Sequence, residues 1–147
     1  MRARRTARSV AGVPVTTHGE GEMSSSTAAI EVKNFDSPDE ARPFEANGEV
    51  RLVTVAGKEI GKGVFEPGWS WSADVKPIAG TDSCEFPHFL YVVSGRMRVV
   101  MDDGNEVELR AGDVASIPPG HDAEVLGDEP CVTVDLGEED GGYAKSA

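Results

Sequence analysis

Cysteine is scarce in this chain of 147 residues, with only Cys84 and Cys131. Two cysteines far apart exclude a disulfide-rich scaffold, although one bridge between them stays open. No apolar run approaches the roughly 18 residues that a membrane-spanning helix needs. Basic residues are also few, because 14 Lys and Arg face 26 Asp and Glu, for a formal net charge of -12. Such an acidic surface repels phosphate backbones, so neither nucleic acid nor a membrane is an expected partner.

What is present is typical of one β-rich domain. Hydrophobic residues make up 39% of the chain and charged residues 27%, which allows a packed core. The 17 glycines and nine prolines favour many turns and short strands over long helices. Free thiols are the default for two isolated cysteines, which indicates a cytoplasmic protein.

The ends of the chain differ from its middle. Residues 1–30 combine a few arginines with small and polar residues, so we expect a disordered basic extension. The apolar run at 10–15 is too short and too broken for a secretory signal, and Met23 is a second possible start. Residues 31–138 carry the folded domain, and residues 139–147 read as a flexible acidic tail.

Secondary structure can be read from turn residues and periodicity. Ser37 followed by Pro38 and Glu40 is typical of a capped helix start, and Pro43 would end that short helix. Short strands separated by Gly, Pro and Asp follow, at a spacing of roughly 8–12 residues, which indicates an antiparallel sandwich or barrel. The expected strands cover 50–55, 60–65, 69–75, 84–93, 96–102, 106–110, 113–117, 121–126 and 131–136.

One hairpin can be predicted in more detail. Residues directly opposite each other in a hairpin share a face, so the apolar residues of its two strands should pair. A three-residue loop over 103–105 would set Met101 against Val107 and Val99 against Leu109. The apolar pattern therefore predicts an odd-length loop.

Two segments, Glu85 to Gly95 and Gly112 to Gly120, resemble the motifs of a known protein family. The run from Gly112 to Gly120, with Pro118 between them, resembles the second cupin motif, and Glu85 to Gly95 resembles the end of the first. The similarity covers about residues 48–137. It implies an all-β, double-stranded β-helix of the jelly-roll type, a cupin barrel with a small-molecule cavity that often holds a metal. It also implies a homodimer.

The metal ligands depart from the usual cupin set of three His and one Glu. At the matching positions this chain has Asp82, Cys84 and His88, and the His of the second motif is replaced by Ala123 with His121 nearby. Even spacing in a strand places side chains on one face. Cys84, His88 and His121 would then form a site with an open position for Zn²⁺, Fe²⁺ or copper, with Asp82 as a further ligand or a carboxylate that orients a histidine.

Function divides into competing classes. In the first, the chain is a metal-dependent enzyme of the dioxygenase or isomerase type, whose substrate lies beside Trp69, Trp71, Met97 and Met101. In the second, it is a metal-free binding or regulatory cupin whose cysteine and histidines are ordinary buried residues. An accessory protein with a filled interior is a third class. The sequence alone does not decide whether the protein is an enzyme.

Overall fold

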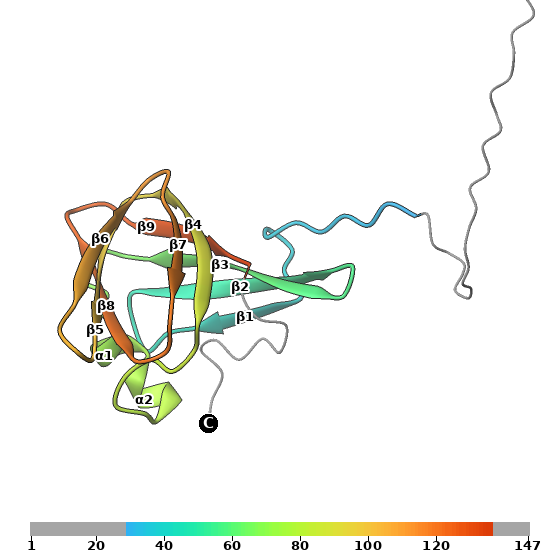
Figure 1. The fold of residues 1–147 in the computed structure, drawn as a ribbon. Coiled ribbons are helices and arrows are strands. Elements are labelled where there is room, and N and C mark those ends of the chain that lie inside the picture. Colours follow the sequence, from blue (N-terminus) through green and yellow to red (C-terminus); the bar gives the residue numbers. More distant parts are fainter. Residues whose placement is uncertain (1–28, 137–147) are drawn as a thin grey trace, which may run out of the picture. The chain divides into compact units, whose positions relative to one another are not determined.

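The structure is a computed structural model that describes residues 29–136, and the part from Val32 onward forms one compact unit. Antiparallel strands of this unit form two sheets (Figure 1). One sheet has six strands in the order β1-β2-β3-β9-β4-β7, and the other has three in the order β6-β5-β8. The strands are β1 (Glu40–Pro43), β2 (Gly48–Val55), β3 (Lys58–Phe65), β4 (His88–Ser94), β5 (Arg96–Met101), β6 (Glu106–Arg110), β7 (Val114–Ile117), β8 (His121–Leu126) and β9 (Cys131–Asp135).

The hydrophobic core lies between the two sheets. Strand β4 alternates strictly, with His88, Leu90 and Val92 buried and the residues between them exposed. Because successive side chains of a strand point to opposite faces, this alternation sends His88 into the interior with the apolar residues. From the smaller sheet, Met97 and Val99 join the same buried cluster. The core therefore includes polar side chains, His88, His121 and Thr133, in a mostly apolar lining.

The predicted β-rich class is confirmed, and two finer expectations are not. Within residues 29–136 the two sheets do not join into a closed barrel. The helix expected from Ser37 to Pro43 is wrong, because Glu40–Pro43 forms β1, paired with β2. Asp39 explains the change. Its N–H donates to Leu52 O at 2.8 Å, and its carboxylate accepts from the backbone of β2, so sheet pairing outweighs the local capping signal.

The segment expected as a strand over 69–75 is a helical turn. Trp71–Asp74 forms α1 and Lys76–Ala79 forms α2, and only Ser70 makes a bridge, with Glu124 of β8. Ser70 caps α1, since its hydroxyl accepts from Ala73 N at 3.2 Å. The Asp74 carboxylate accepts from Ser70 N at 3.1 Å, which closes the cap from the other side. Apolar alternation alone did not distinguish this turn from a strand.

The predicted hairpin has the right faces and the wrong register. Strands β5 and β6 place Val99 opposite Val107 and Met97 opposite Leu109, two residues from the expected pairing. The loop between them contains Gly104 at φ 96°, a left-handed conformation that glycine adopts without strain. Met101 N donates to Asn105 O at 2.8 Å across this loop, and the apolar pattern fixes only which residues share a face.

The predicted terminal segments lie almost entirely outside the described residues, which begin at 29 and end at 136. Within that range, no helix has the length and apolar character needed to cross a membrane.

Candidate metal centre and ligand cavity

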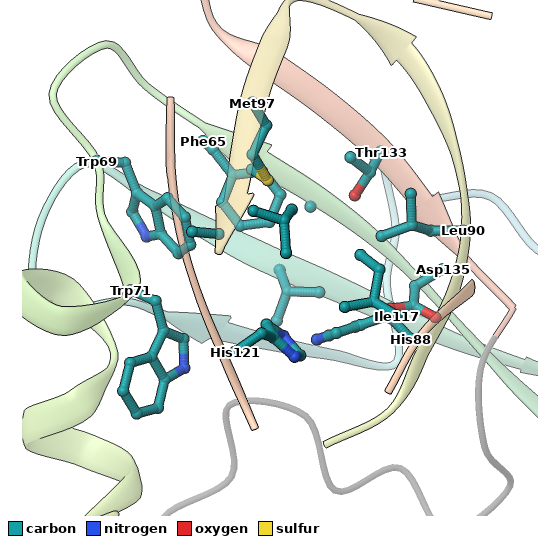
Figure 2. Close-up of a pocket in the computed structure, with 14 residues that line it drawn as sticks. Phe65, Trp69, Trp71, His88, Leu90, Met97, Ile117, His121, Thr133 and Asp135 are labelled. Carbon is teal, nitrogen blue, oxygen red and sulfur yellow. The ribbon is translucent and has the colours of Figure 1, made fainter. Parts of the chain in front are cut away.

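Three side chains that the sequence analysis grouped lie together in the interior. Cys84, His88 and His121 are all buried, and each offers one ligand atom within 4.8 Å of the other two. Cys84 Sγ is 3.7 Å from His88 Nε2, and the two imidazole rings meet edge to face with centroids 5.2 Å apart. Figure 2 shows both histidines at the same end of the cavity. The cluster contains one sulfur and two imidazole groups, which are ordinary ligands of transition metals.

Backbone pairing brings Cys84 to His121. The two residues form an isolated antiparallel bridge, in which Cys84 N donates to His121 O at 2.7 Å. Gly120 N donates to Cys84 O at 2.7 Å, so the turn before β8 also holds the cysteine. Strand β4 begins at His88 because Pro87 lacks the N–H that a sheet needs, and this leaves Cys84 on a separate bridge.

Each histidine has a hydrogen-bond acceptor on its Nδ1 atom. His88 Nδ1 lies 2.5 Å from Asp135 Oδ2, and His121 Nδ1 lies 2.8 Å from Pro118 O. Since a carboxylate and a carbonyl only accept, both Nδ1 atoms carry the proton in the neutral rings. The lone pair of each ring is then on Nε2. This is the tautomer and the orientation that protein carboxylates and carbonyls impose on metal-binding histidines.

Burial keeps the Cys84 thiol and the His121 imidazole uncharged in the metal-free protein. Desolvation raises the pKa of the Cys84 thiol from 9.0 to about 11. Desolvation also lowers the pKa of His121, with the neighbouring His88 contributing in the same direction. At neutral pH the sulfur is therefore a thiol and His121 an uncharged imidazole, so a bound metal would have to displace the thiol proton.

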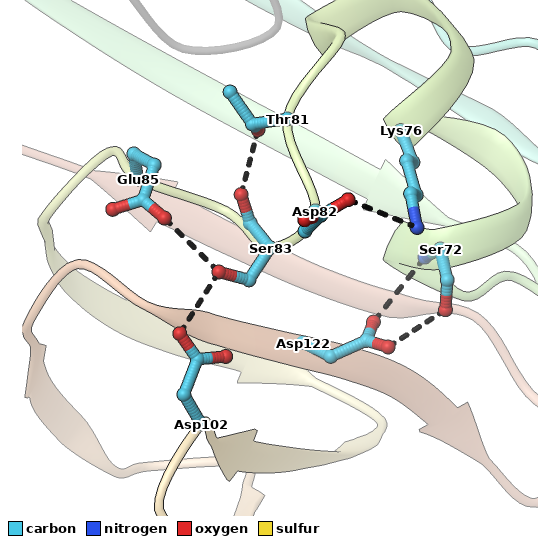
Figure 3. Close-up of polar contacts among 8 residues, drawn as sticks. All are labelled: Ser72, Lys76, Thr81, Asp82, Ser83, Glu85, Asp102 and Asp122. Atoms are coloured by element: carbon cyan, nitrogen blue, oxygen red, sulfur yellow. Dashed lines mark hydrogen bonds and ion pairs between the residues drawn. The ribbon is translucent and has the colours of Figure 1, made fainter.

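Polar contacts fix the chain on both sides of Cys84 (Figure 3). Ser83 Oγ lies 3.0 Å from Glu85 Oε2 and 3.1 Å from Asp102 Oδ2, at the end of the β5 hairpin. Near the start of β8, Ser72 Oγ donates to Asp122 Oδ2 at 2.7 Å, which joins α1 to the residue after His121. These contacts hold the segment before β4 against the smaller sheet, so the sulfur is held in place by its surroundings.

A mostly apolar cavity extends from the cluster into the core (Figure 2). It leaves about 40 Å³ for the centres of water molecules. Three of the four predicted pocket residues, Trp69, Trp71 and Met97, line it, and both tryptophans are 2% exposed. Met101 does not line it and packs half-buried against the core. The remaining lining is Val50, Gly63, Phe65, His88, Leu90, Val99, Ile117, His121, Ala123, Thr133 and Asp135.

Aromatic rings form one wall of the cavity. Phe65 meets Trp69 edge to face with centroids 4.6 Å apart and stacks on Phe44 at 5.3 Å. Trp69 belongs to the loop after β3, and its carbonyl accepts from Val125 N at 2.9 Å. The ring therefore occupies a fixed place between the sheets, although it does not lie in a strand as expected.

The carboxylate beside the cluster is Asp135, which the sequence analysis missed, and Asp82 is not involved. The Asp82 side chain is fully exposed and lies 4.0 Å from Lys76 Nζ. Asp135 ends β9, and it lines the cavity next to His88. The sequence did contain a pattern that points to Asp135. It is two residues from Thr133 and four from Cys131, so it shares their buried face of the strand. Only pairing of β9 with β4 places it near His88, which is 47 residues away.

Comparison with known proteins agrees with this architecture. Residues 82–137 match the family model described as a cupin domain. Polyketide cyclase RemF from Streptomyces resistomycificus is 18% identical, with a TM-score of 0.52 over 73% of this chain and 78% of its own. A protein of unknown function from Acinetobacter sp. ADP1 is also 18% identical, with a TM-score of 0.50 over 68% of this chain and 90% of its own. No curated protein matches the chain.

Residues 82–137 thus match a cupin domain, as the first and second motif segments indicated. The matched residues run from the segment before Cys84 to the end of β9 and include His88, His121 and Asp135. The solved relatives share its fold at identities too low to transfer an activity.

Proposed function

We propose that this protein is a small-molecule-binding cupin, of jelly-roll type, that holds a divalent metal on Cys84, His88 and His121. The observation that supports the proposal best is the convergence of one sulfur and two imidazoles within 4.8 Å in the interior. A buried polar side chain that binds no metal usually has protein or water partners for all its polar atoms. Here both histidines have their Nδ1 atoms bound by acceptors, and their metal-binding atoms are on the cluster side.

The donor set fits a transition metal. A thiolate with two imidazoles suits Zn²⁺, Fe²⁺ or copper, and Asp135 orients His88 as carboxylates orient zinc-bound histidines. Three protein ligands leave a coordination position open, and the cavity lies beside it. A metal bound there would supply Lewis acidity toward a carbonyl or water, as an isomerase needs, and iron or copper would also supply the redox chemistry that a dioxygenase needs.

Elemental analysis tests the proposal directly. Purified protein is reconstituted with Zn²⁺ or Fe²⁺, desalted, and analysed for metal by mass spectrometry. We expect one equivalent in the wild type and in Cys131→Ala, a matched control because Cys131 is the other buried free cysteine. Cys84→Ala and His88→Ala should lose the metal while keeping their circular dichroism spectrum. Wild-type protein that takes up no metal would refute the proposal.

A metal-free binding cupin is the second candidate, and one observation favours it. The raised pKa of Cys84 and the lowered pKa of His121 leave these two side chains uncharged, so neither needs a metal cation for charge balance. In that case the cavity binds a small molecule without catalysis. Cys84 belongs to the cluster but does not line the cavity, so in this case wild type and Cys84→Ala would bind the same ligands with the same affinity, whereas a metal-dependent site would lose its ligand in Cys84→Ala.

Self-association is a further part of the proposal. The outer face of β4 exposes Phe89, Tyr91 and Val93 to 51%, 44% and 46%. Adjacent apolar side chains on one sheet face are typical of an interface, which supports the homodimer expected from the family. Sedimentation of wild type and Tyr91→Glu tests it. A cytoplasmic location remains a prediction from the free thiols.

A further inference from the structure

The cavity contains a polar group that the proposed metal site does not use. Thr133 of β9 lines the cavity and is 3% exposed. Its hydroxyl points inward in Figure 2. Its Oγ1 atom makes no hydrogen bond with any residue in the range 29–136. A hydroxyl that faces a mostly apolar cavity without a protein partner is open to hydrogen bonding by a ligand or water.

A glycine opposite Thr133 keeps this hydroxyl open. Gly63 of β3 is the cross-strand partner of Thr133. A Cβ atom at position 63 would lie 3.2 Å from Thr133 Oγ1 and 2.5 Å from the Phe65 ring. The absence of a side chain at Gly63 therefore leaves space beside the hydroxyl, inside a wall that is otherwise apolar.

The hydroxyl and the metal cluster lie at different places along the same cavity. Thr133 and Asp135 are two residues apart on one face of β9, which separates their Cα atoms by about 7 Å. Asp135 contacts His88 of the cluster. A ligand of about three carbons in length spans such a distance. The cavity has room for about three waters, the volume of about five or six non-hydrogen atoms.

The charges along the cavity disfavour an anion. Among the lining residues, the ionisable ones are His88, His121 and Asp135, and neither lysine nor arginine lines the cavity. A divalent ion held by the Cys84 thiolate, next to the Asp135 carboxylate, would have both its charges balanced. An anionic ligand would lose its hydration without meeting a compensating cation.

We propose that the cavity binds a compact neutral molecule with two polar ends, one facing the Cys84–His88–His121 cluster and the other hydrogen-bonded to Thr133. The ligand class is a three-carbon to four-carbon hydroxy-amide, hydroxy-ketone or similar uncharged compound. This inference rests on the proposed function, because the cluster is taken as the site of the first polar end.

Three probes of six non-hydrogen atoms test the class. 3-Hydroxypropanamide has both polar ends, butanamide replaces its hydroxyl by a methyl group, and 3-hydroxypropanoate replaces its amide by a carboxylate. Binding is measured by NMR titration of the zinc-loaded protein. We expect 3-hydroxypropanamide to bind at least about tenfold more tightly than 3-hydroxypropanoate. A carboxylate that binds equally well would overturn the inference.

A matched variant tests Thr133. Thr133→Val keeps the side-chain shape and removes the hydroxyl, so it should weaken 3-hydroxypropanamide by about threefold to tenfold and leave butanamide unchanged. Thr133→Ser should restore the affinity, and Thr54→Val, at an exposed position of β2, should have no effect. An equal effect of Thr133→Val on both amides would overturn the contact.

The two proposals can fail separately. Metal content is measured in the same samples as binding. If the protein takes up no zinc and Thr133→Val still weakens only the binding of 3-hydroxypropanamide, the metal centre is refuted and the ligand class is supported. If the protein takes up zinc and Thr133→Val affects the binding of both amides equally, the metal centre is supported and the ligand class is refuted.

Discussion

The hydrogen bond between His88 and Asp135 gives a sharp test of the metal centre. The carboxylate accepts from His88 Nδ1 at 2.5 Å, and the two side chains are only 8% and 15% exposed. In this partly buried position the carboxylate fixes the orientation of the imidazole and makes its Nε2 atom a stronger electron-pair donor to a metal. Loss of such a partner typically weakens metal binding by about 10-fold to 100-fold, or about 1.4–2.7 kcal/mol.

Two substitutions separate charge from hydrogen bonding. Asp135→Asn keeps an acceptor oxygen without the charge, and we expect a loss of about tenfold in metal affinity. Asp135→Ala removes the acceptor, and we expect a loss nearer 100-fold. The assay is competition for Zn²⁺ with a chromophoric chelator at fixed pH. Asp103→Asn, in the exposed β5–β6 loop, is the matched control.

The pattern of results decides the role of Asp135. Unchanged zinc affinity in both variants, with loss of zinc in His88→Ala, would refute the orienting role. Equal losses in Asp135→Asn and Asp103→Asn would indicate a general effect of charge on metal attraction. Circular dichroism and urea unfolding of each variant distinguish lost affinity from lost folding.

Three further predictions follow from burial and backbone geometry. Metal affinity should rise by about tenfold per pH unit from pH 7 to 9, since binding releases the Cys84 proton whose pKa is about 11, while His121 is already neutral; a flat profile from a titration series would contradict this. Burial also raises the pKa of Cys131 from 9.0 to about 11, so its stabilising effect is complete below pH 9 and disappears as pH rises through 11. Urea unfolding should show that wild type loses about 2 kcal/mol more stability from pH 9 to pH 11 than Cys131→Ala, in which Cys84 still contributes a loss of its own. Gly95→Ala should destabilise by about 3 kcal/mol or more, because its Cβ would lie 2.2 Å from a backbone oxygen at φ +81°, whereas Gly57→Ala, at φ +79° in open space, should cost about 1 kcal/mol; equal melting temperatures would refute the steric argument.

The positions of most strands followed from the sequence. Turn residues such as Gly112 and Gly127 separate short apolar segments, and eight of the expected strands lie close to β2–β9. Where expectation failed, a contact distant in sequence decided the outcome. The backbone of β2 bonds Asp39 and draws 40–43 into the sheet, and Asp122 on β8 holds Ser72 in α1.

In the candidate site, too, local patterns predicted some residues and contacts distant in sequence decided the others. Side-chain parity along 84–88 and the motif ending at Gly120 were local patterns, and they grouped Cys84, His88 and His121, which do lie together. Parity has a limit, because it gives the face of a strand and not the neighbour across the sheet. Asp135 reaches His88 only because β9 inserts between β3 and β4, a pairing that no local pattern specifies.

The sequence by itself thus determined the β-rich class, the strand segments and the faces of their residues, since these depend on periodicity and turn chemistry within a few residues. Tertiary structure alone decided the register of the β5–β6 hairpin, the helical turn at Trp71, the position of Asp135 beside His88 and that of the Thr133 hydroxyl opposite Gly63. The physical reason is that each of these depends on contacts between segments far apart in the chain, and only the folded sheets bring those segments together.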